Sequence, residues 1–278
     1  MSTRSEILRL EGARLYYEVR GAGPVLLMIP GGPTDAGAFA ALAGFLADRY
    51  TVVAYDPRGN SRSVVDGPPQ DQRMDVHGDD AARLLATLDG APAGVLGSSG
   101  GAQIGLNLVA RYPGRVRTLI AHEPPCVELL PDAEEQRSFM QAVYDTHRVE
   151  GLGPAWAKFL SGTGMADRPG EERATGSPPP PETGEMMERI RGNLGFFLAH
   201  GVRAISGYLP DVAALRAGTT RVAVGIGETS RAQLAHRSAL ALAERLGVAP
   251  VTFPGGHVGH GDQAAAYAQV LDRVLRGE

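Results

Sequence analysis

Short apolar runs bounded by glycine and proline alternate along this chain with longer segments whose apolar residues recur every three or four positions. The short runs are typical of buried strands, and the longer segments have the period of amphipathic helices. This alternation predicts an α/β protein with a mostly parallel sheet covered by helices on both faces. The expected strands lie at residues 24–30, 50–56, 93–97, 116–123, 221–227 and 249–255, and the expected helices at residues 36–49, 79–90, 101–114, 230–247 and 262–277.

The alternation stops between residues 127 and 210. Helix-like segments follow one another there without a strand, at residues 131–149, 154–162 and 182–200. A proline-rich stretch at residues 173–184 cannot continue a helix. We therefore expect residues 1–126 and 211–278 to form one α/β core, and residues 127–210 to form an inserted helical cap rather than a second independent domain.

Charge and cysteine content narrow the possible partners. The formal net charge is −4 with acidic and basic residues interspersed, so neither a nucleic acid nor a membrane is an expected partner. The single cysteine, Cys126, is expected to be a small buried apolar residue. Residues 1–19 lack the continuous apolar stretch of a secretory signal, and no run approaches the ~20 apolar residues of a spanning helix. A cytoplasmic location is expected.

A small-residue motif stands between the strand expected at 93–97 and the helix after it. Gly97, Ser98, Ser99, Gly100 and Gly101 fit the pattern G-x-S-x-G with Ser99 at its centre. This pattern suits a sharp strand-to-helix turn that exposes the central hydroxyl and aims backbone amides at whatever the serine attacks. We interpret Ser99 as a nucleophile, with a merely structural tight turn as the alternative, and Ser98 as a filler of the turn.

A serine nucleophile needs a base, which the sequence places near its end. His257 follows a predicted strand and the stretch Pro-Gly-Gly, whose glycines allow a close approach to Ser99. His260 is the nearest competitor. The remaining histidines are interpreted as packing or surface residues, namely His77, His122, His147, His200 and His236.

Four segments in this order, MIPGGPTDAGAF, YDPRGNSRS, LGSSGG and FPGGH, resemble the α/β-hydrolase superfamily. The resemblance implies the α/β-hydrolase fold and the chain order nucleophile, acid, histidine. It also implies an oxyanion hole made by the amide of Gly100 and, from the loop after the first long strand, that of Gly32. Pro30 stands where many members have a histidine. Asp56 is interpreted as a structural residue that holds the turn beside Arg58.

The acid of the triad departs from the commonest family pattern. That pattern puts an aspartate where this chain has Ser230, which we expect instead to form a capping box with Gln233 for the next helix. Glu123 lies at the end of the strand that follows the nucleophile helix, and we favour it as the acid over Glu228. In its SSG, HEPP and GETS stretches the chain is similar to the zearalenone-type lactone hydrolases, which have a glutamate at that place.

The expected activity is hydrolysis of carboxylic esters or lactones by Ser99, Glu123 and His257 through an acyl-enzyme. No metal and no cofactor are expected, because no carboxylate or cysteine cluster accompanies the two histidines of HVGH and no nucleotide-binding glycine motif is present. Alternatives on the same scaffold are carbon–carbon or amide hydrolysis, cofactor-free peroxidation, and a binding protein without turnover.

The predicted cap is rich in aromatic residues and methionines, most of which are expected to pack against the core. Those considered are Trp156, Phe159, Leu160, Met186, Met187, Phe196, Phe197 and Tyr208. Among them Trp156, Met186 and Met187 are the predicted substrate contacts, since such side chains suit an apolar or ring-containing compound. The expected partner is thus a small apolar ester or lactone, and monomer and homodimer both stay open.

Overall fold

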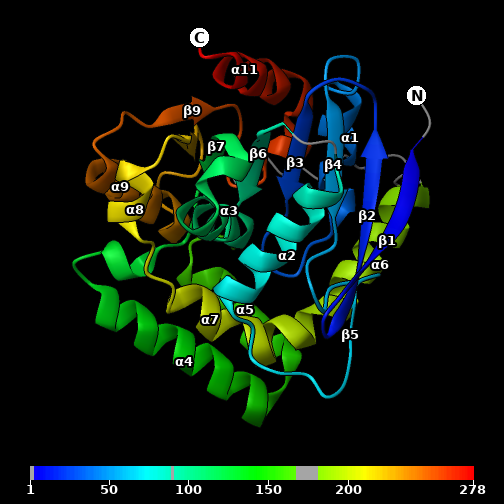
Figure 1. Ribbon diagram of the computed structural model, residues 1–278. Coiled ribbons are helices and arrows are strands. Elements are labelled where there is room, and N and C mark those ends of the chain that lie inside the picture. Colours follow the sequence, from blue (N-terminus) through cyan, green and yellow to red (C-terminus); the bar gives the residue numbers. More distant parts are fainter. Residues whose placement is uncertain (1–2, 89–90, 167–180) are drawn as a thin grey trace, which may run out of the picture.

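A nine-stranded sheet runs through the residues that the computed structural model describes, which are 3–88, 91–166 and 181–278 (Figure 1). The strands are β1 (Arg4–Leu10), β2 (Ala13–Arg20), β3 (Val25–Ile29), β4 (Thr51–Tyr55), β5 (Val64–Val65), β6 (Ala93–Ser98), β7 (Val116–His122), β8 (Arg221–Gly227) and β9 (Val251–Phe253). Their order is β1-β2-β4-β3-β6-β7-β8-β9, and β5 pairs with β2.

The pairing within this sheet is mostly parallel, as the sequence predicts. From β4 through β3, β6, β7 and β8 to β9, each strand is parallel to its neighbour. The six expected strands all form, and the expectation of an α/β fold is confirmed. The antiparallel hairpin of β1 and β2 was not predicted. Only alternate residues of β1 are partly buried, so it lacks the continuous apolar run of a central strand.

Helices cover both faces of the sheet. Consecutive strand residues point to opposite faces, so that Leu27 belongs to an apolar cluster with residues of α2, α3 and α9, and Leu26 to a second cluster with residues of α1 and α11. The helices and short helical turns of the core are η1 (Ala36–Phe39), α1 (Ala40–Gly44), α2 (Met74–Thr87), α3 (Gly100–Arg111), η2 (Pro113–Arg115), α9 (Leu234–Leu246), α10 (Gly259–Asp262) and α11 (Ala264–Arg276). The parallel strands therefore lie between two apolar layers.

Two helix starts differ from the sequence expectation. Helix α2 begins at Met74, five positions before the predicted start at residue 79. Helix α9 begins at Leu234, and its N-cap Gln233 makes no side-chain capping hydrogen bond. The capping box of Ser230 and Gln233 is therefore wrong, because the Ser230 hydroxyl is used by the buried carboxylate described below.

Between β7 and β8 the described residues form helices and no strand. They are η3 (Val127–Leu129), α4 (Ala133–Glu150), α5 (Leu152–Gly162), α6 (Pro181–Phe196), the π-helical turn η4 (Phe197–Gly201), α7 (Val202–Ser206) and α8 (Val212–Ala217). Figure 1 shows α4, α5 and α7 together on one side of the molecule. Residues 173–180 of the predicted proline-rich loop lie outside the described residues, and residues 181–184 already belong to α6. The boundaries of the cap stay a prediction.

A separate apolar cluster joins these helices to the core. Its buried members are Val127, Leu130, Met140, Val143, Ala155, Phe197, Leu198, Val202 and Leu234. Since Leu234 belongs to α9 of the core, this layer is continuous with the sheet domain. Within the described ranges, none of the helices has both the length and the hydrophobicity needed to cross a membrane.

Candidate active site

Ser99 occupies the sharp turn between β6 and α3. Its backbone has φ 55° and ψ −124°, a conformation that L-residues rarely adopt and that persists only where the surroundings hold it. The flanking glycines are required sterically, since a Cβ on Gly97 would meet the carbonyl oxygen of Gly101 and one on Gly101 would meet that of Ile29. The strained turn expected from the G-x-S-x-G pattern is therefore present, with the serine at its apex.

Two backbone amides converge beside this turn. A Cβ built on Gly100 would lie 3.4 Å from the nitrogen of Gly32, and Gly32 itself has φ +54°. The carbonyl of Gly32 accepts a hydrogen bond of 3.0 Å from Nδ2 of Asn60, which also donates to Thr34 O at 2.9 Å. Asn60 thus fixes the loop that carries the predicted second oxyanion donor. Sequence reasoning did not single out Asn60, because its partners lie 26 and 28 residues away along the chain.

Glu123 directly follows β7 and, like Ser99 after β6, has a positive φ. Its φ is 46°, and its amide donates to Gly225 O at 2.9 Å, just as the amide of Ser99 donates to His122 O at 2.9 Å. Both residues therefore extend the parallel hydrogen-bond ladder by one step while turning their side chains off the strand end. The Glu123 side chain is fully buried.

His257 is hydrogen-bonded to this buried carboxylate. Its Nδ1 lies 2.7 Å from Glu123 Oε2, and the residue is only 7% exposed. Because an ionised carboxylate can only accept, Nδ1 carries the proton and Nε2 is left as the acceptor that a general base needs. His122 lies near both predicted catalytic residues. Its carbonyl oxygen accepts a hydrogen bond from the Ser99 amide, and its ring centroid lies 6.5 Å from that of His257.

The second oxygen of Glu123 has its own set of donors. Oε1 accepts hydrogen bonds from the amide of Gly227 at 2.9 Å, from the hydroxyl of Ser230, and from His236 Nδ1 at 3.3 Å. Burial alone would raise the pKa of Glu123, but the hydrogen bonds from His236 and His257 bring that pKa well below its usual range. The carboxylate is therefore ionised at neutral pH although no solvent reaches it.

Ser230 and His236 serve this carboxylate rather than the roles expected of them. Ser230 is fully buried and holds Glu123 in place of capping α9. His236, expected to be a packing or surface residue, is buried. Its Nδ1 lies 3.2 Å from the hydroxyl oxygen of Ser230. Ser230 lies in the loop before α9 and His236 in the first turn of that helix. Their contacts with Glu123 depend on where β7 ends, so the sequence around them gives no recognisable signal.

The rival candidates for the acid and for the base, Glu228 and His260, are not part of the pair of Glu123 and His257. Glu228 is exposed to solvent, and its amide donates to Phe253 O at 3.1 Å. His260 is buried against Phe39, with ring centroids 4.7 Å apart, and burial lowers its pKa to about 3. Among the described residues, the carboxylate that pairs with His257 is that of Glu123.

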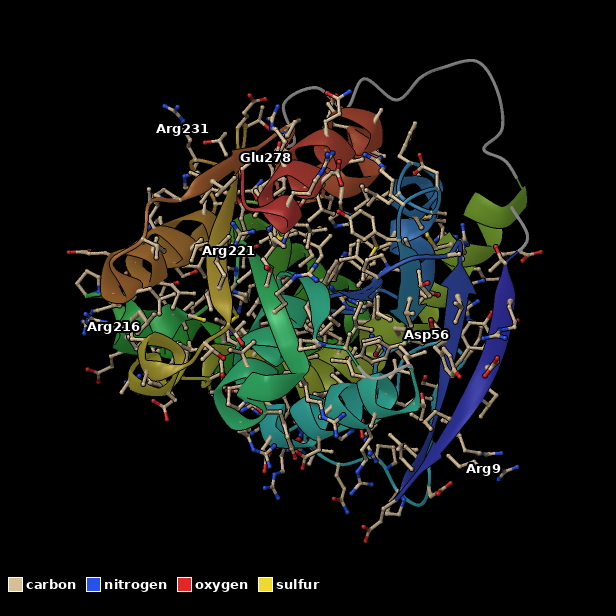
Figure 2. All side chains as sticks on the ribbon, turned by 45° about the horizontal axis from the view of Figure 1, so that its top comes forward. Arg9, Asp56, Arg216, Arg221, Arg231 and Glu278 are labelled. Atoms are coloured by element: carbon tan, nitrogen blue, oxygen red, sulfur yellow. The ribbon has the colours of Figure 1, made fainter. Side chains whose placement is uncertain are left out.

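Asp56 is a structural residue of the turn after β4, as expected. It accepts hydrogen bonds from Arg62 Nε at 2.8 Å and from the Ala36 amide at 3.0 Å. Arg58 pairs with Asp80. Asp56 is fully buried, whereas Figure 2 shows the labelled Arg9, Arg216 and Arg231 at the periphery of the molecule. Asp56 therefore ties η1 to the turn after β4.

A cavity of about 40 Å³ lies beside the two glycine amides. Its lining comes from the loops after β3 and β4, from α2 and α3, and from the turn between α6 and α7, and includes Gly32, Gly100, Phe196, Phe197 and Ile205.

The predicted substrate contacts Trp156, Met186 and Met187 are not among the described residues that line this cavity. Trp156 stacks on Phe159 with ring centroids 5.2 Å apart, Met186 lies against Gly37, and Met187 is 44% exposed. Substrate contact by these three residues stays a prediction.

The single cysteine can also be located. Cys126 is fully buried, and burial raises its thiol pKa to about 12. The described residues hold no group of three or more histidine, cysteine, aspartate or glutamate side chains placed to bind a metal ion.

Comparison with known proteins gives two kinds of relatives. An uncharacterized hydrolase of Bacillus subtilis, YraK, is 35% identical over 284 residues, which cover 100% of this chain and 98% of that protein. Zearalenone hydrolase of Cladophialophora bantiana is 35% identical over 127 residues, which cover 44% of this chain and 47% of that protein. The first similarity spans the whole chain and the second only part of it.

Solved structures share the fold at lower identity. An esterase from Thermogutta terrifontis has a TM-score of 0.74 at 21% identity, covering 95% of this chain and 94% of its own. An enol-lactonase from Burkholderia xenovorans has a TM-score of 0.72 at 18% identity, covering 98% of this chain and 100% of its own. A family model described as the alpha/beta hydrolase fold matches residues 24–168. With this match and the full-length relative, the chain belongs to the alpha/beta hydrolase family.

Proposed function

We propose that this protein is a serine hydrolase that cleaves carboxylic esters or lactones of apolar small molecules, with Ser99, Glu123 and His257 as its catalytic residues. The observation that carries the proposal is the 2.7 Å hydrogen bond between His257 and the buried carboxylate of Glu123, at the same sheet edge as the strained Ser99. A serine becomes nucleophilic when an imidazole accepts its proton and a carboxylate orients that imidazole.

The reaction follows from these positions. His257 Nε2 takes the proton of the Ser99 hydroxyl as its oxygen bonds to the ester carbonyl carbon, and the amides of Gly32 and Gly100 stabilise the negative charge on the carbonyl oxygen. The imidazolium returns its proton to the leaving alcohol as the ester bond breaks. A water molecule, deprotonated by the same histidine, then releases the acyl group from Ser99. Ionised Glu123 stabilises the imidazolium in both halves.

The choice of esters and lactones rests on the site and on the relatives. Apolar side chains line most of the cavity beside the glycine amides, which suits a neutral substrate. The partial similarity to zearalenone hydrolase favours a lactone as one member of the class. We further propose that the helical segment 127–210 caps the site, since Phe197 and Ile205 from that segment contribute to the cavity.

Covalent labelling tests this proposal directly. We expect a fluorophosphonate probe to modify the purified protein at one site and p-nitrophenyl acetate to be hydrolysed. Ser99→Ala is expected to abolish the labelling and to lower hydrolysis by at least about 10³-fold. Ser98→Ala is the matched control, because Ser98 is the last residue of β6, one position before the turn, and it should retain both. Labelling that survives Ser99→Ala would contradict the proposal.

A further inference from the structure

The polar groups around the cavity beside Gly32 and Gly100 differ in whether their hydrogen-bonding atoms have partners. Arg58 is engaged by Asp80 through two hydrogen bonds, of 2.8 Å from Nε and 2.7 Å from Nη2. Nδ2 of Asn60 donates hydrogen bonds to the carbonyl oxygens of Gly32 and Thr34. Since the guanidinium charge is already balanced by a carboxylate, this wall does not offer a free cation to an anionic substrate.

His77 is the exception. It belongs to α2, lines the cavity and is 5% exposed. Its Nε2 lies 2.6 Å from Gln72 Oε1, while Gln72 Nε2 donates to Gln70 O at 3.3 Å. Because the amide oxygen can only accept, His77 Nε2 is the protonated nitrogen.

The protonation state of the other ring nitrogen of His77, Nδ1, follows from this assignment. Burial, and next the charge of Arg58, lower the pKa of His77 to about 4, so the ring is neutral at physiological pH. A neutral ring with its proton on Nε2 leaves Nδ1 as an acceptor, and this buried Nδ1 has no hydrogen-bond partner in the described part of the chain. A buried acceptor without a donor is unfavourable unless something bound supplies one.

We propose that His77 is a specificity-determining residue, whose Nδ1 accepts a hydrogen bond from a hydroxyl or N–H group of the substrate. The inference rests on the proposed function and narrows its substrate class to neutral esters or lactones that carry a donor group on an otherwise apolar body. Three observations agree with this class: two donor amides lie at one side of the cavity, the lining residue His77 has a ring nitrogen without a hydrogen-bond partner in the described part of the chain, and the rest of the lining is mostly apolar and includes Met74 and Ile104.

Matched ester pairs test the proposal. The probes are phenyl esters of ω-hydroxy acids with two to six carbons, each compared with the ester in which a methyl group replaces the hydroxyl. A second pair, 4-hydroxyphenyl and 4-methylphenyl acetate, carries the donor on the leaving group. For at least one pair we expect kcat/KM of the wild-type protein to favour the hydroxylated ester by about tenfold or more, because a site built to bond a hydroxyl rejects the analogue that lacks it.

Two substitutions separate the ring nitrogens of His77. His77→Gln keeps a polar group where Nε2 meets Gln72 and removes the acceptor at Nδ1, so the preference for the hydroxylated ester should fall to about twofold or less. His77→Asn keeps a polar atom at the Nδ1 position and should retain most of the preference. The readout is the ratio of the two esters within each variant, which a general loss of folding or activity does not change.

The outcomes separate the two proposals. Hydrolysis of neither member of any pair by the wild-type protein contradicts the proposed function, and the role of His77 falls with it. Hydrolysis of both members of every pair at equal rates contradicts the role of His77 alone. A preference that His77→Gln and His77→Asn retain equally also overturns the role of His77.

Discussion

The hydroxyl of Ser230 donates a hydrogen bond to Oε1 of Glu123, so that a serine from the loop after β8 and a glutamate from the end of β7 meet at one point. Position 230 is where the commonest pattern of the family has its acid. The carboxylate of this chain thus reaches the histidine from the neighbouring strand, and the side chain at 230 supports it. The side chain at position 230 therefore contacts the same carboxylate that is hydrogen-bonded to His257.

The first prediction concerns variants in which the acid is moved from position 123 to position 230. Glu123→Ala should lower kcat/KM for p-nitrophenyl acetate by about 10³-fold or more, because the imidazolium then has no counter-charge. Adding Ser230→Asp to that variant should recover at least about tenfold, since an aspartate at 230 extends one atom beyond the serine into the space that Glu123 leaves.

Ser230→Asn in the same Glu123→Ala background is the control for this recovery. It has the shape of aspartate without the charge and should recover nothing. Equal recovery by the two double variants would show that cavity filling, and not the charge, restores turnover. Circular dichroism of all variants checks that they are folded.

The second prediction compares the two glutamates that the sequence offers. Glu123→Gln should lower kcat by about 10³-fold with a small change in KM, because the amide cannot stabilise the imidazolium and can misorient the ring. Glu228→Gln should leave kcat within about twofold, since Glu228 is exposed. Steady-state kinetics on one p-nitrophenyl ester measure both. A larger loss from Glu228→Gln than from Glu123→Gln would reverse the assignment of the acid.

Much of this fold could be predicted, because its signals lie within short stretches of sequence. The central strands are continuous apolar runs, and the turn at Ser99 needs glycines at fixed positions on either side. The hairpin of β1 and β2 was missed because β1 lies at the sheet edge and lacks such a run. Glu123 could be singled out as a candidate acid because it follows a predicted strand directly.

The partners that complete the site could not be predicted in the same way. Ser230 and His236 lie 107 and 113 residues from Glu123, and no periodic pattern links them to it. Phe197 and Ile205 line the cavity because η4 and α7 turn toward the core, which depends on how several helices pack together. Contacts of this kind are decided by tertiary packing rather than by local propensity.

The third prediction concerns His236, which we expect to position Glu123. His236→Leu removes the donor at Nδ1, and kcat should fall by about threefold to tenfold while KM stays nearly constant, because a hydrogen bond to a charged group contributes about 1.5–3 kcal/mol and only part of it acts on the transition state. His236→Asn keeps a donor near the same place and should stay closer to the wild-type kcat. A rise in KM without a fall in kcat would instead indicate a role in substrate binding.

The fourth prediction is a loss of stability in mild acid caused by buried neutral histidines. Burial lowers the pKa of His122 to about 4 and that of His260 to about 3, and both values lie below the ordinary value of about 6.5 that holds in the unfolded chain. Between these values the unfolded chain binds more protons than the folded one, so the free energy of unfolding falls as pH drops below about 6.5. Glu123 also has a lowered pKa, but its contribution is lost only below about pH 4.3, where the unfolded glutamate gains its proton.

Comparing the free energy of unfolding at pH 8 and at pH 5 therefore measures the contribution of the histidines without that of Glu123. Each of these two should cost about 2 kcal/mol over this range, since 1.5 pH units lie between 6.5 and 5 and each unit corresponds to about 1.4 kcal/mol. His260→Phe keeps a ring beside Phe39 and should shrink the difference between the two pH values by about that amount, as measured by urea unfolding. Phe39→Leu is the control, because it alters the same contact without a titrating group and should lower stability equally at both pH values. An unchanged pH dependence in His260→Phe would mean that His260 is not held neutral by burial.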